Sequence, residues 1–260
     1  MKIYAVANQK GGVGKTTSVI NLGAMLGKND HKTLIVDIDP QANATSSMGV
    51  NKFDVQTSTY DMLLEDVESD QIKMSVESYG VDVLPSNPAL AGAEVELVTA
   101  LGREYRLQNA LKQLDGQYDY VLIDCPPSLG LLTVNALAAA RDGVLIPVQC
   151  EYLALEGLTQ LLQTVELVQR FLNPQLDIRG VIMTMYDSRT NLSRQVVEEV
   201  RRHFKEKVFR TIIPRSVRLS EAPSHALPVS EYAPNSAGAV AYRLLAAELL
   251  NGDRNPEDAS

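Results

Sequence analysis

The sequence predicts an α/β protein of three layers, in which a doubly wound, mostly parallel sheet carries helices on both faces. Short apolar runs rich in Val, Ile and Leu alternate along the chain with segments of helical periodicity, the order that produces βαβ units with right-handed crossovers. Several runs are hydrophobic at nearly every position, which is typical of strands buried on both faces of a parallel sheet.

Individual elements follow from the same patterns. The predicted strands are residues 2–8, 33–38, 81–84, 119–124, 143–148, 178–184 and 208–213. Long helices are predicted over 153–172, 191–206 and 236–250, where Leu and Val recur at about 3.6-residue spacing. No linker rich in Gly, Pro or Ser divides the 260 residues. We therefore expect one domain over 1–250 and a polar, frayed tail over 251–260.

Composition excludes several classes of protein. The 24 basic and 32 acidic residues give a net charge of −8, so the chain is not a uniformly basic coat for nucleic acid. Cys125, Cys150 and three scattered His show no metal-ligand spacing and no disulfide framework. No apolar run is long enough to predict a membrane span. A soluble cytosolic enzyme or binding protein remains.

The most informative segment is Lys10-Gly11-Gly12-Val13-Gly14-Lys15-Thr16-Thr17, which follows the first strand and opens a helix. Glycines allow backbone N–H groups to converge on a phosphate, and the helix directs its positive end at the same anion. Lys15 would reach the β- and γ-phosphates, and the Thr16 hydroxyl would bind Mg²⁺. The common pattern G-x-x-x-x-G-K-[ST] fails at its first position, which is Gln9, and a second lysine, Lys10, appears instead.

Acidic residues end two of the predicted strands, at the sheet edge where parallel α/β proteins bind ligands. Asp124 follows Val121-Leu122-Ile123 and is expected to hold Mg²⁺ directly or through water. Asp39 is the candidate for the metal site and for positioning the attacking water, with Pro40 fixing the turn. Asp37 either supports the metal or caps a loop, and the sequence leaves both interpretations open.

Four stretches together resemble the ParA/Soj family of chromosome and plasmid partitioning ATPases. They are residues 8–17 with the deviant Walker A lysine, 37–45 (DIDPQANAT), 124–130 (DCPPSLG) and 214–224 (PRSVRLSEAPS). They span nearly the whole chain. We expect the short, Soj-like form, because the phosphate loop begins at residue 10 and leaves no room before it for a helix-turn-helix domain.

The resemblance implies a P-loop NTPase fold of the SIMIBI type and an ATP-dependent dimer switch. ATP and Mg²⁺ would close a homodimer in which Lys10 touches the partner's phosphates, so Lys10, Lys15 and Asp39 form the expected catalytic set. Pro214 is the candidate adenine contact. The dimer would bind double-stranded DNA without sequence preference, and a ParB/Spo0J-like centromere-binding protein would stimulate slow hydrolysis. A cytoplasmic, nucleoid-associated protein without membrane attachment is implied.

Charge distribution supports DNA binding independently of the resemblance. Residues 186–220 hold nine Lys/Arg and four acids, so this segment is +5 while the rest of the chain is −13. Such asymmetry in an acidic protein is typical of a phosphate-contacting patch. Arg189 and Arg218 match positions of the family's DNA-contacting arginines, and a dimer would double their number.

Proteins of other functions carry the same phosphate loop, and these functions remain as alternatives. A MinD-like regulator of cell division would end in a basic amphipathic helix, whereas this sequence ends in an acidic tail. A nitrogenase-reductase-like iron–sulfur ATPase needs cluster cysteines, which Cys125 and Cys150 do not fit. A small-molecule ligase would need a substrate pocket that the sequence does not identify. A DNA-coating scaffold that binds ATP with little turnover is the non-enzymatic alternative.

Overall fold

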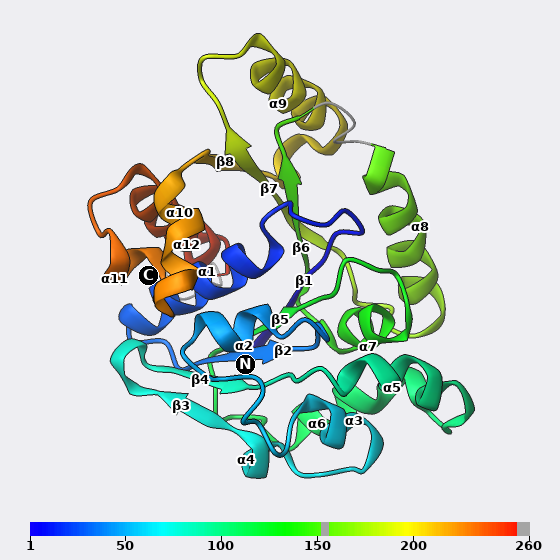
Figure 1. Ribbon diagram of the computed structural model, residues 1–260. Coiled ribbons are helices and arrows are strands. Elements are labelled where there is room, and N and C mark those ends of the chain that lie inside the picture. The colour runs from blue at the N-terminus through cyan, green and yellow to red at the C-terminus, as the bar shows by residue number, and fades with distance from the viewer. Residues whose placement is uncertain (152–155, 254–260) are drawn as a thin grey trace, which may run out of the picture.

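The computed structural model describes residues 1–151 and 156–253, which form a three-layer α/β fold (Figure 1). Within the described residues the strands form one eight-stranded sheet of order β3-β4-β2-β5-β1-β6-β7-β8. Every pairing is parallel except that of β3 with β4. The predicted doubly wound, mostly parallel sheet is therefore confirmed.

All seven predicted strands are present, with small shifts at their ends. The observed strands are β1 (Lys2–Val6), β2 (Thr33–Asp37), β4 (Val81–Leu84), β5 (Tyr120–Asp124), β6 (Gly143–Gln149), β7 (Ile178–Tyr186) and β8 (Val208–Pro214). Strand β3 (Met74–Val76), a three-residue edge strand, was not predicted. Two of its three residues are exposed, so it lacks the buried apolar run that marks the other strands.

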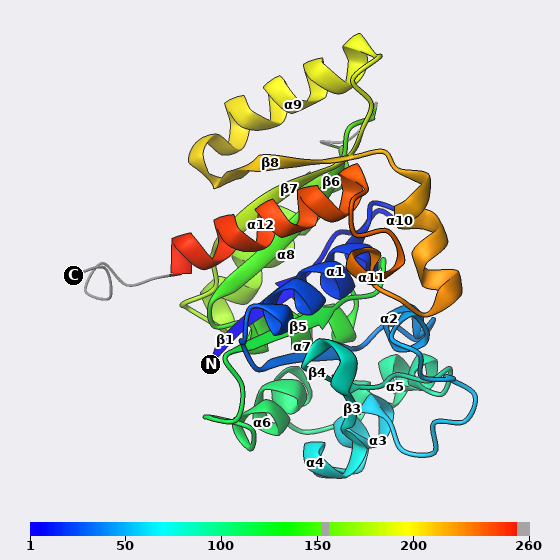
Figure 2. The ribbon, with the colours of Figure 1, turned by 90° about the vertical axis from the view of Figure 1, so that its left-hand side faces the viewer.

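The parallel register brings the carboxyl ends of distant strands to one edge of the sheet. Val6 of β1 pairs with Asp124 of β5, and Asp124 pairs with Asp37 of β2. Figure 2 shows the strands side-on, with α2, α10 and α11 gathered at this edge. The topology alone thus places the end of β1, Asp37 and Asp124 beside one another.

Two hydrophobic cores lie on opposite faces of the sheet, and alternation along β1 separates them. Ile3 and Ala5 join one core, whereas Tyr4 and Val6 join the other. The first core packs against α3, α5–α8 and α9; the second packs against α1, α2 and α10–α12. The sheet is therefore covered on both faces, as near-continuous apolar strands require.

Some of the observed helices were predicted from the sequence and others were not. The observed α-helices are α1 (Lys15–Lys28), α2 (Asn43–Ser47), α3 (Thr59–Leu64), α4 (Ser69–Ile72), α5 (Leu90–Glu96), α6 (Arg106–Lys112), α7 (Leu131–Ala139), α8 (Glu156–Phe171), α9 (Asn191–Phe204), α10 (Val217–Glu221), α11 (Val229–Tyr232) and α12 (Ala237–Asp253). Helices α8, α9 and α12 confirm the three long helices predicted. The predicted start of the first of them, at 153–155, lies outside the described residues.

The last helix extends further than its sequence pattern indicates. Helix α12 runs three residues past the predicted end at 250, into the segment that the sequence assigns to a frayed tail. The Asp253 carboxylate accepts hydrogen bonds from the Tyr4 hydroxyl (2.7 Å) and from Arg179 Nε (3.0 Å). These bonds anchor the final turn to β1 and β7. Among the described helices, none combines the length and the apolar character needed to cross a membrane.

Candidate nucleotide site

The glycine-rich segment forms a tight loop between β1 and α1. Gly12 and Gly14 have φ values of +72° and +91°, a backbone conformation that disfavours other residues. Gly14 caps α1, so the first N–H groups of this 14-residue helix point into the loop. The Thr184 hydroxyl of β7 donates a 2.8 Å hydrogen bond to the Val13 carbonyl. The loop is thus held in the shape of an anion cradle.

Lys15 begins α1 and its side chain turns back into the loop. Its Nζ donates to the Lys10 carbonyl at 3.3 Å, and the residue is only 6% exposed. Burial lowers the pKa of Lys15, although the nearby carboxylates of Asp124 and Asp39 act in the opposite direction. A buried ammonium held inside the loop is suited to bind phosphate oxygens.

Thr16 and Asp124 meet across the sheet edge, as the sequence predicts. Thr16 Oγ1 donates to Asp124 Oδ2 at 2.7 Å, while the buried Oδ1 has no hydrogen-bond partner within the described residues. Burial and the neighbouring Asp37 and Asp39 raise the pKa of Asp124 well above its usual range. An unpartnered carboxylate oxygen beside a hydroxyl fits Mg²⁺, which prefers oxygen ligands.

The protein donors alone would not enclose a metal ion. Among residues 1–151 and 156–253 there is no group of three His, Cys, Asp or Glu side chains placed to hold one. Mg²⁺ typically takes one or two carboxylates and completes its shell with water and phosphate oxygens. The Thr16–Asp124 pair fits that requirement and not a dedicated metal cage.

Asp37 and Asp39 end β2 but face different surroundings. Asp37 is fully buried, and its two oxygens accept hydrogen bonds from the backbone N–H groups of Asp39 (3.1 Å) and Thr45 (2.8 Å) and from the Thr45 hydroxyl (2.7 Å). Burial raises the pKa of Asp37 to about 6. Of the two interpretations left open, loop capping is therefore the one the geometry supports.

Asp39 remains close to the phosphate loop. It is 6% exposed, and its Oδ1 accepts the Gln41 N–H at 2.9 Å. Its charge acts on both Lys15 and Asp124. The turn through Pro40 thus leaves this carboxylate among the residues that surround the cradle.

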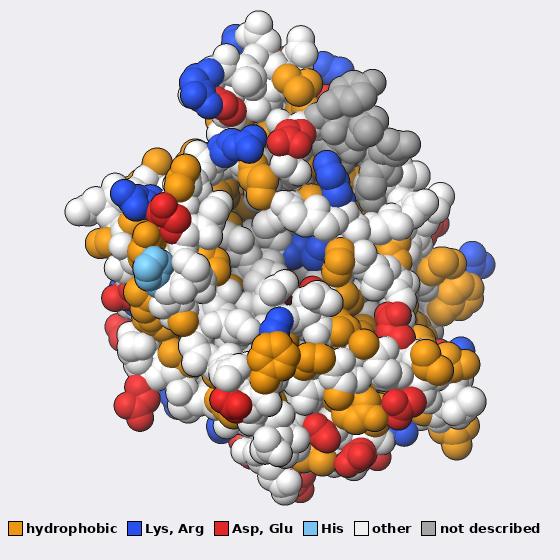
Figure 3. Space-filling model, viewed as in Figure 1, with side chains coloured by type: hydrophobic (Ala, Val, Ile, Leu, Met, Phe, Trp, Pro, Cys, Tyr) orange, Lys and Arg blue, Asp and Glu red, His pale blue; other side chains and the backbone are white. Residues whose placement is uncertain are grey.

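Lys10 lies at the mouth of the loop. Its backbone N–H donates to Asn8 Oδ1 at 3.0 Å, and Asn8 in turn donates to the Pro147 carbonyl at 2.7 Å. In the part of the chain that the structure describes, no carboxylate forms an ion pair with the Lys10 ammonium. Figure 3 shows the face hollowed at its centre, with a basic side chain in the hollow.

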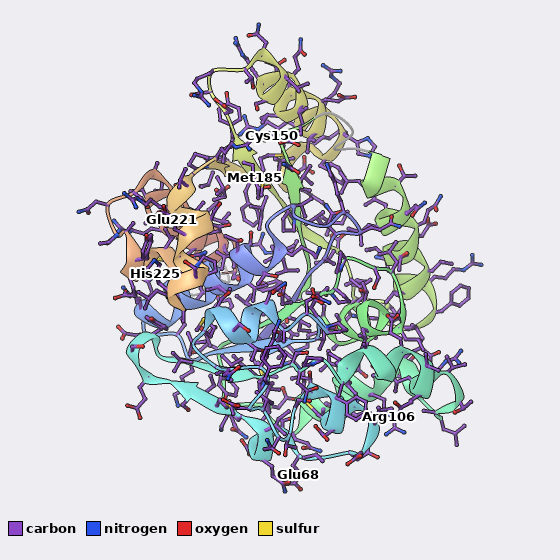
Figure 4. All side chains as sticks on the ribbon, in the orientation of Figure 1. Glu68, Arg106, Cys150, Met185, Glu221 and His225 are labelled. Atoms are coloured by element: carbon purple, nitrogen blue, oxygen red, sulfur yellow. The ribbon has the colours of Figure 1, made fainter. Side chains whose placement is uncertain are left out.

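A pocket of about 430 Å³ adjoins the loop. Its lining includes Gly14 of the loop, Thr17 of α1, Met185 at the end of β7 and Pro214 at the end of β8. Met185 has φ +53°, and the pairing of β7 with β8 is irregular on either side of Met183. Figure 4 labels Met185 on β7 and Glu221 on α10. The pocket places Pro214 next to the loop, and its contact with a base remains a prediction.

Arg189 and Arg218 follow the carboxyl ends of β7 and β8, so both lie at the same sheet edge as the loop. Their side chains are 84% and 57% exposed. The Arg189 guanidinium forms two hydrogen bonds with Asp187 (2.9 and 2.7 Å), and the Arg218 guanidinium forms one with Glu221 at 2.8 Å. Exposed ion pairs of this kind are weak and can exchange partners.

Two polar residues at the site were not predicted from the sequence. Thr184, which fastens Val13, is the last residue of the predicted strand 178–184, just as Asp124 is the last residue of the predicted strand 119–124, so the same strand-end signal was available. Ser86 follows β4 after Pro85, and its hydroxyl donates to the Asp39 carbonyl at 2.8 Å. No local pattern marks Ser86, because its partner lies 47 residues away.

A parallel sheet whose first strand leads through a glycine-rich, lysine-bearing loop into a helix defines a P-loop nucleotide-binding protein. A family model described as an AAA domain matches residues 1–178. The chain is 56% identical over 248 residues to the sporulation initiation inhibitor protein Soj of Bacillus subtilis (strain 168), covering 95% of this chain and 98% of that protein. It is 52% identical over 252 residues to the chromosome partitioning protein ParA of Myxococcus xanthus (strain DK1622), covering 97% and 89%.

A solved structure gives the same result for the fold. It is described as cobyrinic acid a,c-diamide synthase from Mycobacterium smegmatis with a bound ATP analog and magnesium. The TM-score is 0.86 at 43% identity, over 96% of this chain and 95% of that one. With two relatives named Soj and ParA matched along almost their whole length, the chain belongs to the Soj/ParA family of chromosome-partitioning ATPases.

Proposed function

We propose that the protein binds ATP with Mg²⁺, closes into a homodimer and in that state binds double-stranded DNA without sequence preference. A ParB/Spo0J-like centromere-binding protein stimulates hydrolysis and releases the DNA. Turnover is slow without that partner and DNA. The protein is accordingly cytoplasmic and nucleoid-associated.

One observation carries the dimer proposal: Lys10 sits at the loop mouth with no carboxylate pairing its ammonium among the described residues, whereas Lys15 is buried within the loop. Lys15 already binds the phosphates from inside the loop. A second, at the rim, can add its charge to a triphosphate held by a facing copy of the chain. Charge-assisted contacts of this kind strengthen as the interface excludes water.

Within one chain, different residues bind the phosphates, hold Mg²⁺ and position the attacking water. The loop N–H groups and Lys15 bind and orient the phosphates. Thr16 and Asp124 would hold Mg²⁺, which when bound neutralises charge developing on the phosphate oxygens. Asp39 positions the attacking water and polarises its O–H bond. Pro214 and the adjoining pocket receive the base.

Coupling to DNA follows from the position of the arginines. Arg189 and Arg218 project from the edge that also carries the loop, so closing two chains at this edge brings two such sets together. Doubling the number of phosphate contacts raises DNA affinity and steepens its dependence on salt. The nucleotide state thereby controls DNA binding.

A DNA-binding titration with ATP, with ADP and without nucleotide tests this function. We expect retention of unrelated duplexes with MgATP only, and its loss in Lys10→Ala, which should still bind ATP. Lys112→Ala, an exposed lysine on α6, is the matched control. Binding independent of nucleotide would contradict the switch, and ATP-dependent binding to anionic vesicles in place of DNA would favour the MinD-like alternative.

A further inference from the structure

Four residues, three from the ends of two neighbouring strands and one from α2, form a closed ring of hydrogen bonds. Asp37 Oδ1 accepts from the Asp39 N–H (3.1 Å), and the Asp39 carbonyl accepts from the Ser86 hydroxyl (2.8 Å). The Ser86 N–H donates to Thr45 Oγ1 (2.9 Å), and this hydroxyl donates to Asp37 Oδ2 (2.7 Å). The ring begins and ends on the same carboxylate.

Solvent cannot substitute for these bonds. Asp37, Thr45 and Ser86 are fully buried, and Asp39 is 6% exposed. Removing one partner therefore leaves a buried polar group unsatisfied, which costs more than losing the same bond at a surface. Each hydroxyl in the ring has a defined partner, so its geometry is fixed by its neighbours and not by water.

The ring fixes the backbone of Asp39 through both its N–H group and its carbonyl. Its N–H is bound by Asp37 and its carbonyl by Ser86, while Ala42 N–H donates to the same carbonyl at 2.8 Å. Residues 39–42 turn sharply, with Ala42 at φ +50°. A turn of this kind needs external support to keep one conformation.

The ring also joins the turn to the sheet. Asp37 ends β2, and Ser86 lies two residues after Leu84 ends β4, the strand that pairs with β2. Thr45 belongs to α2, so one hydroxyl connects this short helix to both strand ends. A five-residue helix has little stability of its own. Its position, and that of the turn before it, depends on this connection.

We propose that Thr45 and Ser86 are positioning residues for ATP hydrolysis, which hold the Asp39 carboxylate where it orders the attacking water. The proposal rests on the role of Asp39 given under the proposed function. Among the described residues, neither hydroxyl forms a hydrogen bond with the phosphate loop, so both act on the rate of hydrolysis through Asp39 and leave nucleotide binding to Lys15 and the glycines. Misplacing a catalytic group by about 1 Å can cost roughly a hundredfold in rate.

Single-turnover hydrolysis and ATP affinity, measured on the same variants, test the proposal. Ser86→Ala removes one hydroxyl, and Thr45→Val removes the other at similar size. Both should slow hydrolysis by about tenfold or more while ATP affinity stays within about threefold of the wild type. Thr45→Ser keeps the hydroxyl and should restore the rate. Ser69→Ala is the matched control, because Ser69 is equally buried but bonds the distant Ala110 carbonyl.

Hydrolysis by Ser86→Ala at the wild-type rate would overturn the proposal, and so would a parallel loss of rate and ATP affinity. If Thr45→Val fails to fold, Ser86→Ala decides, since it deletes a single hydroxyl and its melting temperature shows whether it folds. Asp39→Ala distinguishes a failure of the role given to Asp39 from a failure of the positioning role given to Thr45 and Ser86. Undiminished hydrolysis by Asp39→Ala rejects the role of Asp39, whereas an inactive Asp39→Ala with a fully active Ser86→Ala rejects only the positioning role.

Discussion

Thr16 Oγ1 donates a 2.7 Å hydrogen bond to Asp124 Oδ2, although the two residues lie 108 positions apart. The bond occupies one carboxylate oxygen and leaves the buried Oδ1 without a partner in the described part of the chain. This pair joins the start of α1 to the end of β5 and places a hydroxyl and an unsatisfied carboxylate oxygen together beside the loop.

Replacing Lys15 by Ala should abolish ATP binding. The buried ammonium is the charge that the loop offers to the phosphates, and truncating one partner of such a pair weakens binding by about a hundredfold or more. Titration with a fluorescent ATP analogue measures the affinity. Lys28→Ala, at the far end of the same helix, should bind as the wild type does. ATP affinity retained by Lys15→Ala would remove this residue from the site.

Asp39→Ala should accumulate an ATP-bound dimer, because binding residues remain while the group that orders the attacking water is lost. Size-exclusion chromatography with MgATP reports the oligomeric state, and Asp54→Ala on an exposed loop is the control. Elution of Asp39→Ala as a monomer under saturating ATP would count against the dimer switch.

Arg189→Glu and Arg218→Glu should each lose DNA retention while keeping ATP-driven dimerisation. Reversing a charge at an exposed phosphate contact should weaken DNA binding by about tenfold or more at moderate salt. Arg170→Glu on α8 makes the same charge change on another exposed arginine of the chain. A gel-shift titration in which all three variants match the wild type would exclude both arginines from the DNA surface.

Raising the salt concentration should weaken DNA binding steeply and equally for unrelated duplexes, since phosphate contacts release counterions whatever the sequence. The slope of log affinity against log salt should become shallower by about two for each contacting arginine replaced by Ala, because the replacement removes one phosphate contact from each of the two subunits. Fluorescence anisotropy at several salt concentrations measures the slope. Strong dependence on duplex sequence would indicate base contacts in place of phosphate contacts.

Asp37 should make the nucleotide-free protein more stable in mild acid. Burial raises its pKa from 3.8 to about 6, so the folded state keeps the proton to higher pH than the unfolded state does. Its contribution to stability is complete below the unfolded pKa and disappears as pH rises through the folded value. Relative to Asp37→Asn, the wild type should lose about 1 kcal/mol of unfolding free energy between about pH 5 and pH 7. Urea unfolding with EDTA measures it; parallel pH curves for the two proteins would contradict the assignment.

Much of the fold could be predicted because local sequence patterns indicate its strands and long helices. Apolar runs such as Val121-Leu122-Ile123 marked the central strands, and α8, α9 and α12 were long enough for their periodicity to register. The short helices α2–α6 were not predicted, because four to seven residues span too few turns to show a helical period. Strand β3 was missed for the related reason that its three residues are mostly exposed.

By itself the sequence determined the phosphate loop, the acidic strand ends and the family resemblance, since each depends on residues that are neighbours in the chain. Only the tertiary structure decided that Asp37 is bound by Thr45, that Thr184 fastens the loop, and that Ser86 holds the Asp39 carbonyl. These partners lie on different strands, loops and a short helix. Their contacts arise when the parallel sheet gathers its carboxyl ends at one edge, a long-range event that no local pattern records.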